Sequence, residues 1–151
     1  MKVRARPLLL LAMMIAGVAQ AQAMRDGAGV ARGLPKPAII LFWADWCAPC
    51  RAETRMIAQL DQAAAPAPVI VVPMESGPRT REALGGVNPE RVRYSGSNPY
   101  LLLRTLAGDT AGLPVSVAID RAGTTCAIKQ GAITVGDVRA WALKCAKPAP
   151  G

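Results

Sequence analysis

Three short runs of aliphatic residues, each bounded by polar or turn-forming segments, divide this chain. Runs of this length, rich in Val, Ile and Leu, are typical of strands that are buried on both faces of a sheet. The predicted strands are residues 38–44, 69–72 and 115–119. A fourth strand, residues 124–129, is predicted after the turn sequence Asp120–Gly123, so the last two strands are expected to form a hairpin.

Helices are predicted between and after these strands. In residues 47–64, apolar side chains recur at helical spacing and alternate with Arg and Gln. Pro99 suits the first turn of a helix over residues 99–107. A closing helix begins at the N-cap Thr134, carries Asp137 at its third position and runs to residue 145. The order strand, helix, strand, insert, strand, strand, helix predicts an α/β fold with a mixed central sheet flanked by helices.

The N-terminal residues have the layout of a secretory signal peptide. Residues 1–7 are cationic, residues 8–18 are an unbroken apolar run, and Ala21 and Ala23 end small-x-small cleavage patterns. The alternative is an uncleaved signal anchor, but the apolar run is about half of the ~20 residues that a membrane span needs. We therefore expect residues 1–23 to be cleaved and the mature chain to be soluble and periplasmic.

The remaining chain is expected to hold one domain. Residues 24–37 are rich in Gly, Ala and Arg, which predicts a flexible arm. Residues 38–147 are the predicted domain, and residues 148–151 are a tail. The formal net charge of +8 comes from scattered basic residues, without the basic stripe of a nucleic-acid-binding protein. The chain has no histidine, which excludes Ser-His-Asp and Cys-His catalysis.

The segment Trp46–Cys50 (WCAPC) carries the candidate chemistry. It lies where the first strand becomes the first helix, so Cys47 faces unpaired backbone N–H groups and the positive end of the helix dipole, and both favour a thiolate. Cys50 lies one turn further on the same face, close enough for a disulfide. We expect Cys47 to be exposed and to attack, and Cys50 to resolve the mixed disulfide. A structural disulfide and a metal clip are the alternatives.

Three segments resemble the thioredoxin family. Residues 42–51 (FWADWCAPCR) match its active-site segment almost residue for residue, residues 112–115 (GLPV) its cis-proline segment, and residues 120–136 its terminal hairpin. The likeness covers about residues 37–146 and is greatest to the exported TlpA/ResA-like branch. Members of that branch reduce disulfides in the bacterial periplasm, often for cytochrome c maturation.

The resemblance implies a thioredoxin fold with an insert between the second strand and the cis-proline loop. It implies a protein-disulfide reductase that needs no cofactor or metal, and a cis bond before Pro114. The client-binding residues around the cysteines would be Trp46, Ala48, Pro49 and Leu113. A DsbA-like oxidant and a thiol-based metal chaperone or binding module are the alternatives. The expected partners are exported proteins with disulfides and a membrane-bound electron donor, with the protein itself a monomer.

A carboxylate follows the motif by three residues. Glu53 matches a carboxylate of the TlpA/ResA-like branch, which implies that it relays the proton of Cys50. The alternative is a surface carboxylate that is favoured by the helix dipole. Glu75 lies in a segment that also resembles the branch, and it is a weaker candidate. Leu41 occupies the place of the buried aspartate of thioredoxin, so no proton relay is expected there.

The second cysteine pair is predicted to be structural. Cys126 lies on the last strand and Cys145 near the end of the closing helix, which should pack back on the sheet. A disulfide between them would stabilise the fold by about 2–4 kcal/mol. Two free thiols and a second redox pair are the alternatives.

The insert, residues 74–112, is where partner choice is expected to lie. A helical turn is predicted over residues 79–84 and a short strand over 91–94. Tyr94, Tyr100 and Leu101–Leu103 either line a groove or pack as a helix face.

Overall fold

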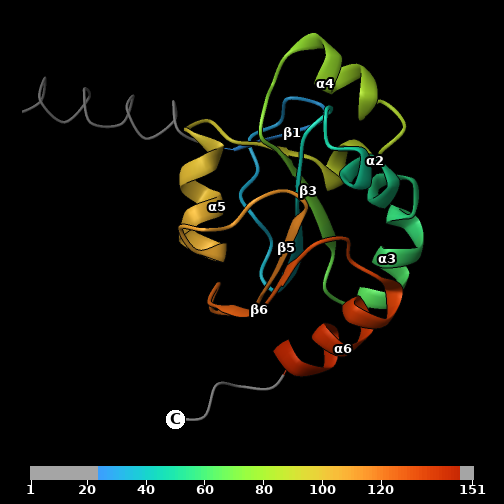
Figure 1. Ribbon diagram of the computed structural model, residues 1–151, viewed down its shortest axis with the longest axis vertical. Helices are drawn as coiled ribbons and strands as arrows, with labels where there is room; N and C mark the ends of the chain where they lie inside the picture. Colours follow the sequence, from blue (N-terminus) through green and yellow to red (C-terminus); the bar gives the residue numbers. More distant parts are fainter. Residues whose placement is uncertain (1–23, 147–151) are drawn as a thin grey trace, which may run out of the picture.

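The computed structural model describes residues 24–146, which form a mixed sheet between two layers of helices (Figure 1). The predicted signal peptide (1–23) and tail (148–151) lie outside the described residues. The elements in chain order are β1 (Arg25–Asp26), β2 (Ala38–Trp43), α2 (Ala48–Arg55), α3 (Ile57–Ala64), β3 (Val69–Pro73), α4 (Pro78–Ala83), the 3-10 helix η1 (Pro89–Arg91), β4 (Arg93–Tyr94), α5 (Pro99–Ala107), β5 (Val115–Ile119), β6 (Thr125–Gln130) and α6 (Val135–Cys145). No helix within residues 24–146 is long and apolar enough to cross a bilayer.

The main sheet has the strand order β3-β2-β5-β6. β2 pairs in parallel with β3 and antiparallel with β5, and β5 pairs antiparallel with β6. The parallel strands β2 and β3 are joined through α2 and α3. The antiparallel strands β5 and β6 are joined by the predicted turn. In that turn Asp120 Oδ1 accepts hydrogen bonds from the N–H groups of Ala122 and Thr124, and Gly123 has a φ of 87°. The predicted mixed sheet flanked by helices is confirmed.

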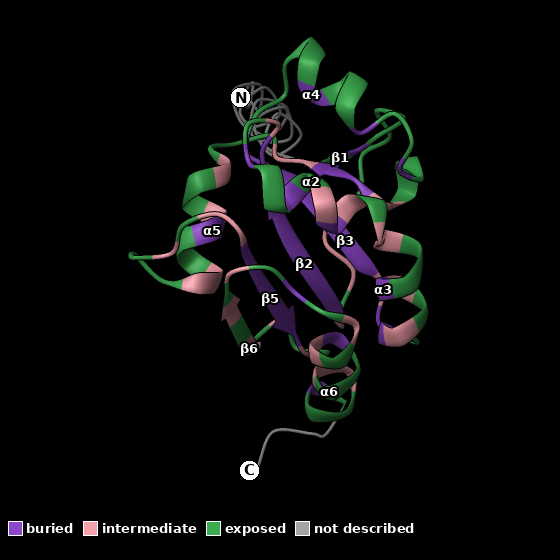
Figure 2. Cartoon of the chain, turned by 45° about the vertical axis from the view of Figure 1, so that its right-hand side comes forward, coloured by how far each residue is buried: buried purple, intermediate pink, exposed green. Residues whose placement is uncertain are grey.

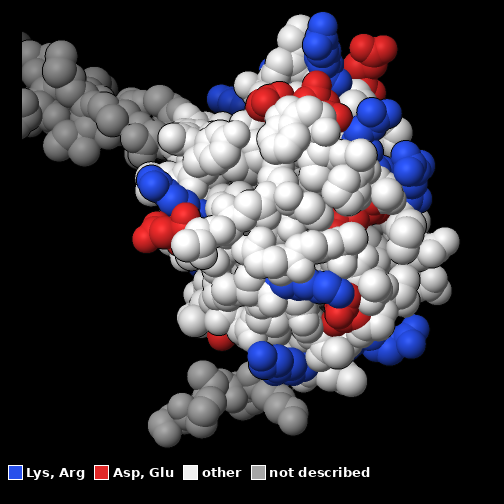
Figure 3. All heavy atoms as spheres, in the orientation of Figure 1, with Lys and Arg blue, Asp and Glu red and all other residues white. Residues whose placement is uncertain are grey.

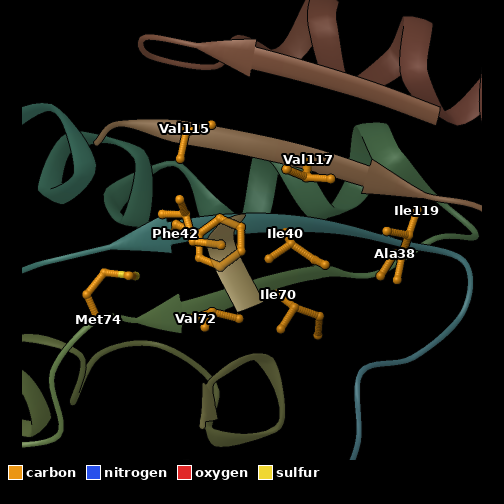
Figure 4. Packing of buried hydrophobic residues seen from close by; sticks show 10 residues of the cluster. Ala38, Ile40, Phe42, Ile70, Val72, Met74, Val115, Val117 and Ile119 are labelled. Carbon is orange, nitrogen blue, oxygen red and sulfur yellow. The ribbon is translucent and has the colours of Figure 1, made fainter. Parts of the chain in front are cut away.

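Every residue of β2 and β3 is buried, because helices cover both faces of the sheet (Figure 2). On one face, Ile40 and Phe42 pack against Val72 and Val115 (Figure 4), and Leu103 of α5 belongs to the same cluster. On the other face, α3 and α6 cover a second cluster that contains Leu41. Burying each large aliphatic side chain contributes about 1.5–3 kcal/mol, so these layers fix the end of β2 from which the cysteine motif starts.

The predicted helix over residues 47–64 is two helices, α2 and α3, with a break at Met56. Near the break the Thr54 hydroxyl donates a hydrogen bond to the Arg51 carbonyl, and such back-bonding competes with regular helical bonds and bends helices. The Met56 N–H then bonds the Glu53 carbonyl three residues back, which tightens the turn. Met56 is thus both the C-cap of α2 and the N-cap of α3.

The predicted flexible arm, residues 24–37, is wrong as a description of its first part. Arg25–Asp26 forms β1, which pairs antiparallel with β4. Asp26 is buried, forms an ion pair with Arg32 at 2.9 Å and accepts the N–H groups of Ala28 and Val30. Sequence reasoning missed this because the partner strand lies almost 70 residues further on, in the segment between β3 and β5.

That segment contains α4, η1, β4 and α5. On α5, Leu103 is buried and Leu102 packs beside it, whereas Leu101 and Tyr100 are exposed. The leucine run is therefore a packed helix face in part. Tyr94 is half-buried and lies under the Arg81 guanidinium at 5.7 Å from the ring centre.

Candidate functional site

Cys47 is the N-cap residue of α2, directly after the loop that leaves β2. Its backbone is extended, with φ −86° and ψ 95°, and Pro49 lies in the first helical turn, where its missing N–H leaves no hydrogen bond unmade. The Cys47 N–H bonds the Ala44 carbonyl at 3.2 Å, and the Cys47 carbonyl accepts the Arg51 N–H at 3.1 Å. Strand end and helix start together hold the residue in place.

Cys47 and Cys50 form a disulfide with a Cα–Cα distance of 5.2 Å. The Cys50 N–H also donates a hydrogen bond to Cys47 Sγ at 3.3 Å. That N–H is one of the groups at the helix start that have no intrahelical partner. On reduction, this bond and the helix dipole both favour the anion on Cys47, and so they favour its reactive form.

Both cysteines are buried, so the exposure predicted for Cys47 is wrong. Cys47 is 4% exposed and Cys50 0%. They pack in one cluster with Trp43, Val71 and, at its edge, Leu113. The disulfide is therefore reached only through Cys47, because no surface of Cys50 is open.

Apolar residues surround this opening; we call Trp46, Ala48, Pro49, Leu113 and Pro114 the apolar rim. Trp46 is 64% exposed, Ala48 and Pro49 are exposed, and Leu113 and Pro114 are half-buried. The Leu113–Pro114 bond is cis. The Pro114 carbonyl accepts the Gly131 N–H at 2.8 Å, which ties the rim to the end of β6. The fold thus brings together rim residues from two distant segments.

The Trp46 indole N–H donates to Glu75 Oε1 at 3.3 Å. Glu75 follows β3, and with Asp45 and the start of α4 it lines a hollow beside Trp46. Glu75 is a weak candidate from the sequence, because a contact with a residue 29 positions away leaves no local sequence pattern. On the face shown in Figure 3, basic and acidic side chains are interspersed.

Glu53 is not a surface carboxylate, because it is 4% exposed. Its Oε1 accepts the Ile133 N–H at 2.8 Å, a contact that spans 80 residues. Burial raises the pKa of Glu53, while the Ile133 hydrogen bond and the charge of Lys129 partly offset this effect. Because Glu53 follows Cys50 by three residues in α2, the two side chains share a helix face.

Lys129, whose charge acts on Glu53, forms an ion pair with Asp137 that sequence reasoning missed. Lys129 Nζ forms an ion pair with Asp137, whose side chain also accepts the Thr134 N–H. The Thr134 side chain in turn accepts the Asp137 N–H, which completes a capping box. The Lys129 bond, with the Thr134 bonds, lowers the pKa of Asp137 to about 2.

A second disulfide joins Cys126 on β6 to Cys145 on α6, with a Cα–Cα distance of 5.8 Å. Cys145 is 7% exposed and Cys126 half-buried. No free cysteine and no cluster of three or more potential metal-ligating side chains occurs among residues 24–146.

No family model matches the chain, and no curated protein matches it significantly. Solved structures do. A thio-disulfide isomerase from Thermus thermophilus aligns at 20% identity with a TM-score of 0.62, over 83% of this chain and 92% of that one. A secreted Mycobacterium tuberculosis disulfide oxidoreductase aligns at 18% and 0.57, over 83% and 97%. The exposed lipoprotein thioredoxin of Streptococcus pneumoniae aligns at 16% and 0.59, over 80% and 96%.

This chain therefore has a thioredoxin-like fold, and its structural neighbours are thiol–disulfide oxidoreductases. The predicted thioredoxin fold is confirmed. At these identities the likeness shows the fold, and the activity has to be argued from the chain's own residues.

Proposed function

We propose that this protein is an exported thiol–disulfide oxidoreductase that reduces disulfides of client proteins through Cys47 and Cys50. One observation carries the proposal. The disulfide lies at a helix N-cap, where the Cys50 N–H bonds Cys47 Sγ, and only Cys47 has accessible surface. One sulfur is thus placed to react and the other to resolve.

The reaction begins with the reduced protein. The Cys47 thiolate attacks one sulfur of a client disulfide, the client S–S bond breaks, and one client sulfur leaves as a thiolate. Cys50 then loses its proton and attacks Cys47 Sγ, so that the mixed disulfide breaks and the second client thiolate leaves. Two electrons have passed to the client, and the Cys47–Cys50 disulfide has formed. A dithiol donor, which we propose to be membrane-bound, reduces it again.

Glu53 is the proposed acceptor of the Cys50 proton. It lies one turn beyond Cys50, buried on the same helix face. Burial raises the pKa of Glu53 toward neutral pH, which favours proton exchange with a thiol. The apolar rim would hold an extended, unfolded client segment beside Cys47.

Export is supported by the predicted signal peptide and by the secreted and exposed neighbours. The reducing direction is supported by the TlpA/ResA-like pattern of the sequence, including Ala48-Pro49 and Glu53. A role in cytochrome c maturation would follow from the same resemblance.

Insulin reduction with dithiothreitol tests the activity. C47S and C50S should abolish catalysis, whereas C126A/C145A, the matched pair, should retain it. Activity of C47S equal to wild type would refute the proposal. The Cys47–Cys50 potential against glutathione tests the direction: a reductant should have a potential of about −270 mV, as thioredoxin does, and a value of about −120 mV would identify a DsbA-like oxidant. Metal bound by the reduced protein without insulin reduction would identify a metal chaperone.

A further inference from the structure

One row of residues crosses the sheet beneath the active-site helix: Leu41 on β2 pairs with Ser116 on β5, which pairs with Lys129 on β6. Side chains alternate between faces along a strand. Val115 and Val117 belong to the α5 face, so Ser116 points to the opposite face, with Leu41. Leu41 is apolar and Ser116 is uncharged and fully buried, so Lys129 is the single charge in this row.

Glu53 reaches the same layer from above. Its hydrogen-bond partner, Ile133, belongs to the buried cluster that contains Leu41. Lys129 is the next-to-last residue of β6 and precedes Ile133 by four residues, and Asp137 is the third residue of α6 and follows Ile133 by four. The short connection between β6 and α6 therefore has Lys129 before it and Asp137 after it, and Glu53 binds its backbone at Ile133.

The charged groups near Glu53 are few. On α2 itself, Cys50 is its titratable neighbour, while Arg51 and Arg55 are exposed. On α3, Asp61 forms an ion pair with Arg91, at 2.7 Å. From β6, the charge of Lys129 lowers the pKa of Glu53, and from α6, Asp137 forms an ion pair with Lys129.

We propose that Lys129, held by Asp137, is a positioning residue that sets the charge on Glu53 and so the pH range in which Cys50 can give up its proton. The inference rests on the proposed role of Glu53. Lys129 is only 32% exposed in its side chain, so its charge is less screened by solvent than that of a surface lysine. A cation near a buried carboxylate favours the ionised form, which is the form that accepts a proton.

The test is a carboxyl ¹³C NMR titration of the oxidised protein, in which the disulfides remove cysteine titration. The chain has four glutamates, and the Glu53 resonance is assigned by its loss in E53Q. K129M removes the charge, K129R keeps it, and K144M removes a matched charge from an exposed position on α6. D137N removes the counter-charge, while Asn keeps an acceptor oxygen for the Thr134 N–H.

The pH midpoint of the Glu53 titration should shift to higher pH in K129M and to lower pH in D137N. It should stay at the wild-type value in K129R and K144M. An unchanged midpoint in folded K129M would overturn the proposal, as would an equal shift in K144M. Should K129M not fold, K129Q replaces it with the same expected shift.

The rate of insulin reduction should fall on the acid side of its pH profile, and in K129M this acid limb should move to higher pH together with the midpoint of the Glu53 titration. A limb that stays in place while the midpoint moves would overturn the link to Cys50. Wild-type protein without any insulin reduction would refute the proposed function instead, and the NMR result, which needs no activity, separates the two failures.

Discussion

Removing the Cys126–Cys145 disulfide should destabilise the fold and leave catalysis intact. The two cysteines are 19 residues apart in sequence, and the chain-entropy relation gives about 3 kcal/mol for a loop of this length. Cys145 is 7% exposed, so losing its packed sulfur adds on the order of 1 kcal/mol. The expected loss for C126A/C145A is therefore about 3–4 kcal/mol, or a Tm lower by about 10–15 °C.

The measurement is urea unfolding of oxidised wild type and oxidised C126A/C145A, in which the Cys47–Cys50 bond is intact. Insulin reduction at a temperature where both proteins are folded gives the catalytic control. A loss below about 1 kcal/mol would show that the bond does not constrain the chain as argued. A loss of activity in the folded variant would mean that this pair is a second redox centre, which is the alternative that the sequence left open.

The remaining predictions concern the active site, the ionisable groups and the arm. E53Q should slow insulin reduction and remove its acid limb, because Gln cannot accept the Cys50 proton; an unchanged pH profile would count against the relay. Because the pKa of Glu53 is raised on folding, the folded state keeps a proton on this group in a pH range where the unfolded state has lost it. The contribution of Glu53 to the free energy of unfolding therefore falls as pH rises from the unfolded to the folded pKa. Urea unfolding of E53Q should lack that decline. For Asp137, whose pKa is lowered from 3.8 to about 2, the stabilising contribution is present above the unfolded value and lost as pH falls toward 2, so D137N and wild type should converge in stability there. W46A should raise the KM for a protein client more than it lowers kcat, since Trp46 is a large, 64% exposed rim residue that does not react; E75Q, which can still accept the indole N–H, is the conservative comparison. D26N should increase hydrogen exchange in residues 25–32 selectively, because Asp26 pairs with Arg32 and accepts two N–H groups of its own loop; uniform exchange across the domain would argue against a local role.

Much of the fold follows from local sequence. Nearly continuous apolar runs identify β2, β3 and β5, because a strand covered on both faces buries almost all of its side chains; Ser116 is the one polar residue in the three strands. Thr134 and Asp137 identify the start of α6, because a capping box is built from residues three apart. The position of Cys47 at a strand-to-helix junction likewise follows from the periodicity that changes at residue 45. These features depend on neighbours in sequence, so the sequence alone determined them.

Tertiary structure decided the features that join distant segments. Local pattern carries no information about which backbone N–H will meet a side chain 80 residues away, as with Glu53 and Ile133. The same holds for β1 pairing with β4, for Trp46 bonding Glu75, and for the burial of Cys47. The helix N-cap that favours a thiolate is a property of the sequence, whereas the buried carboxylate and the lysine beside it exist only because β6 and α6 fold back under α2.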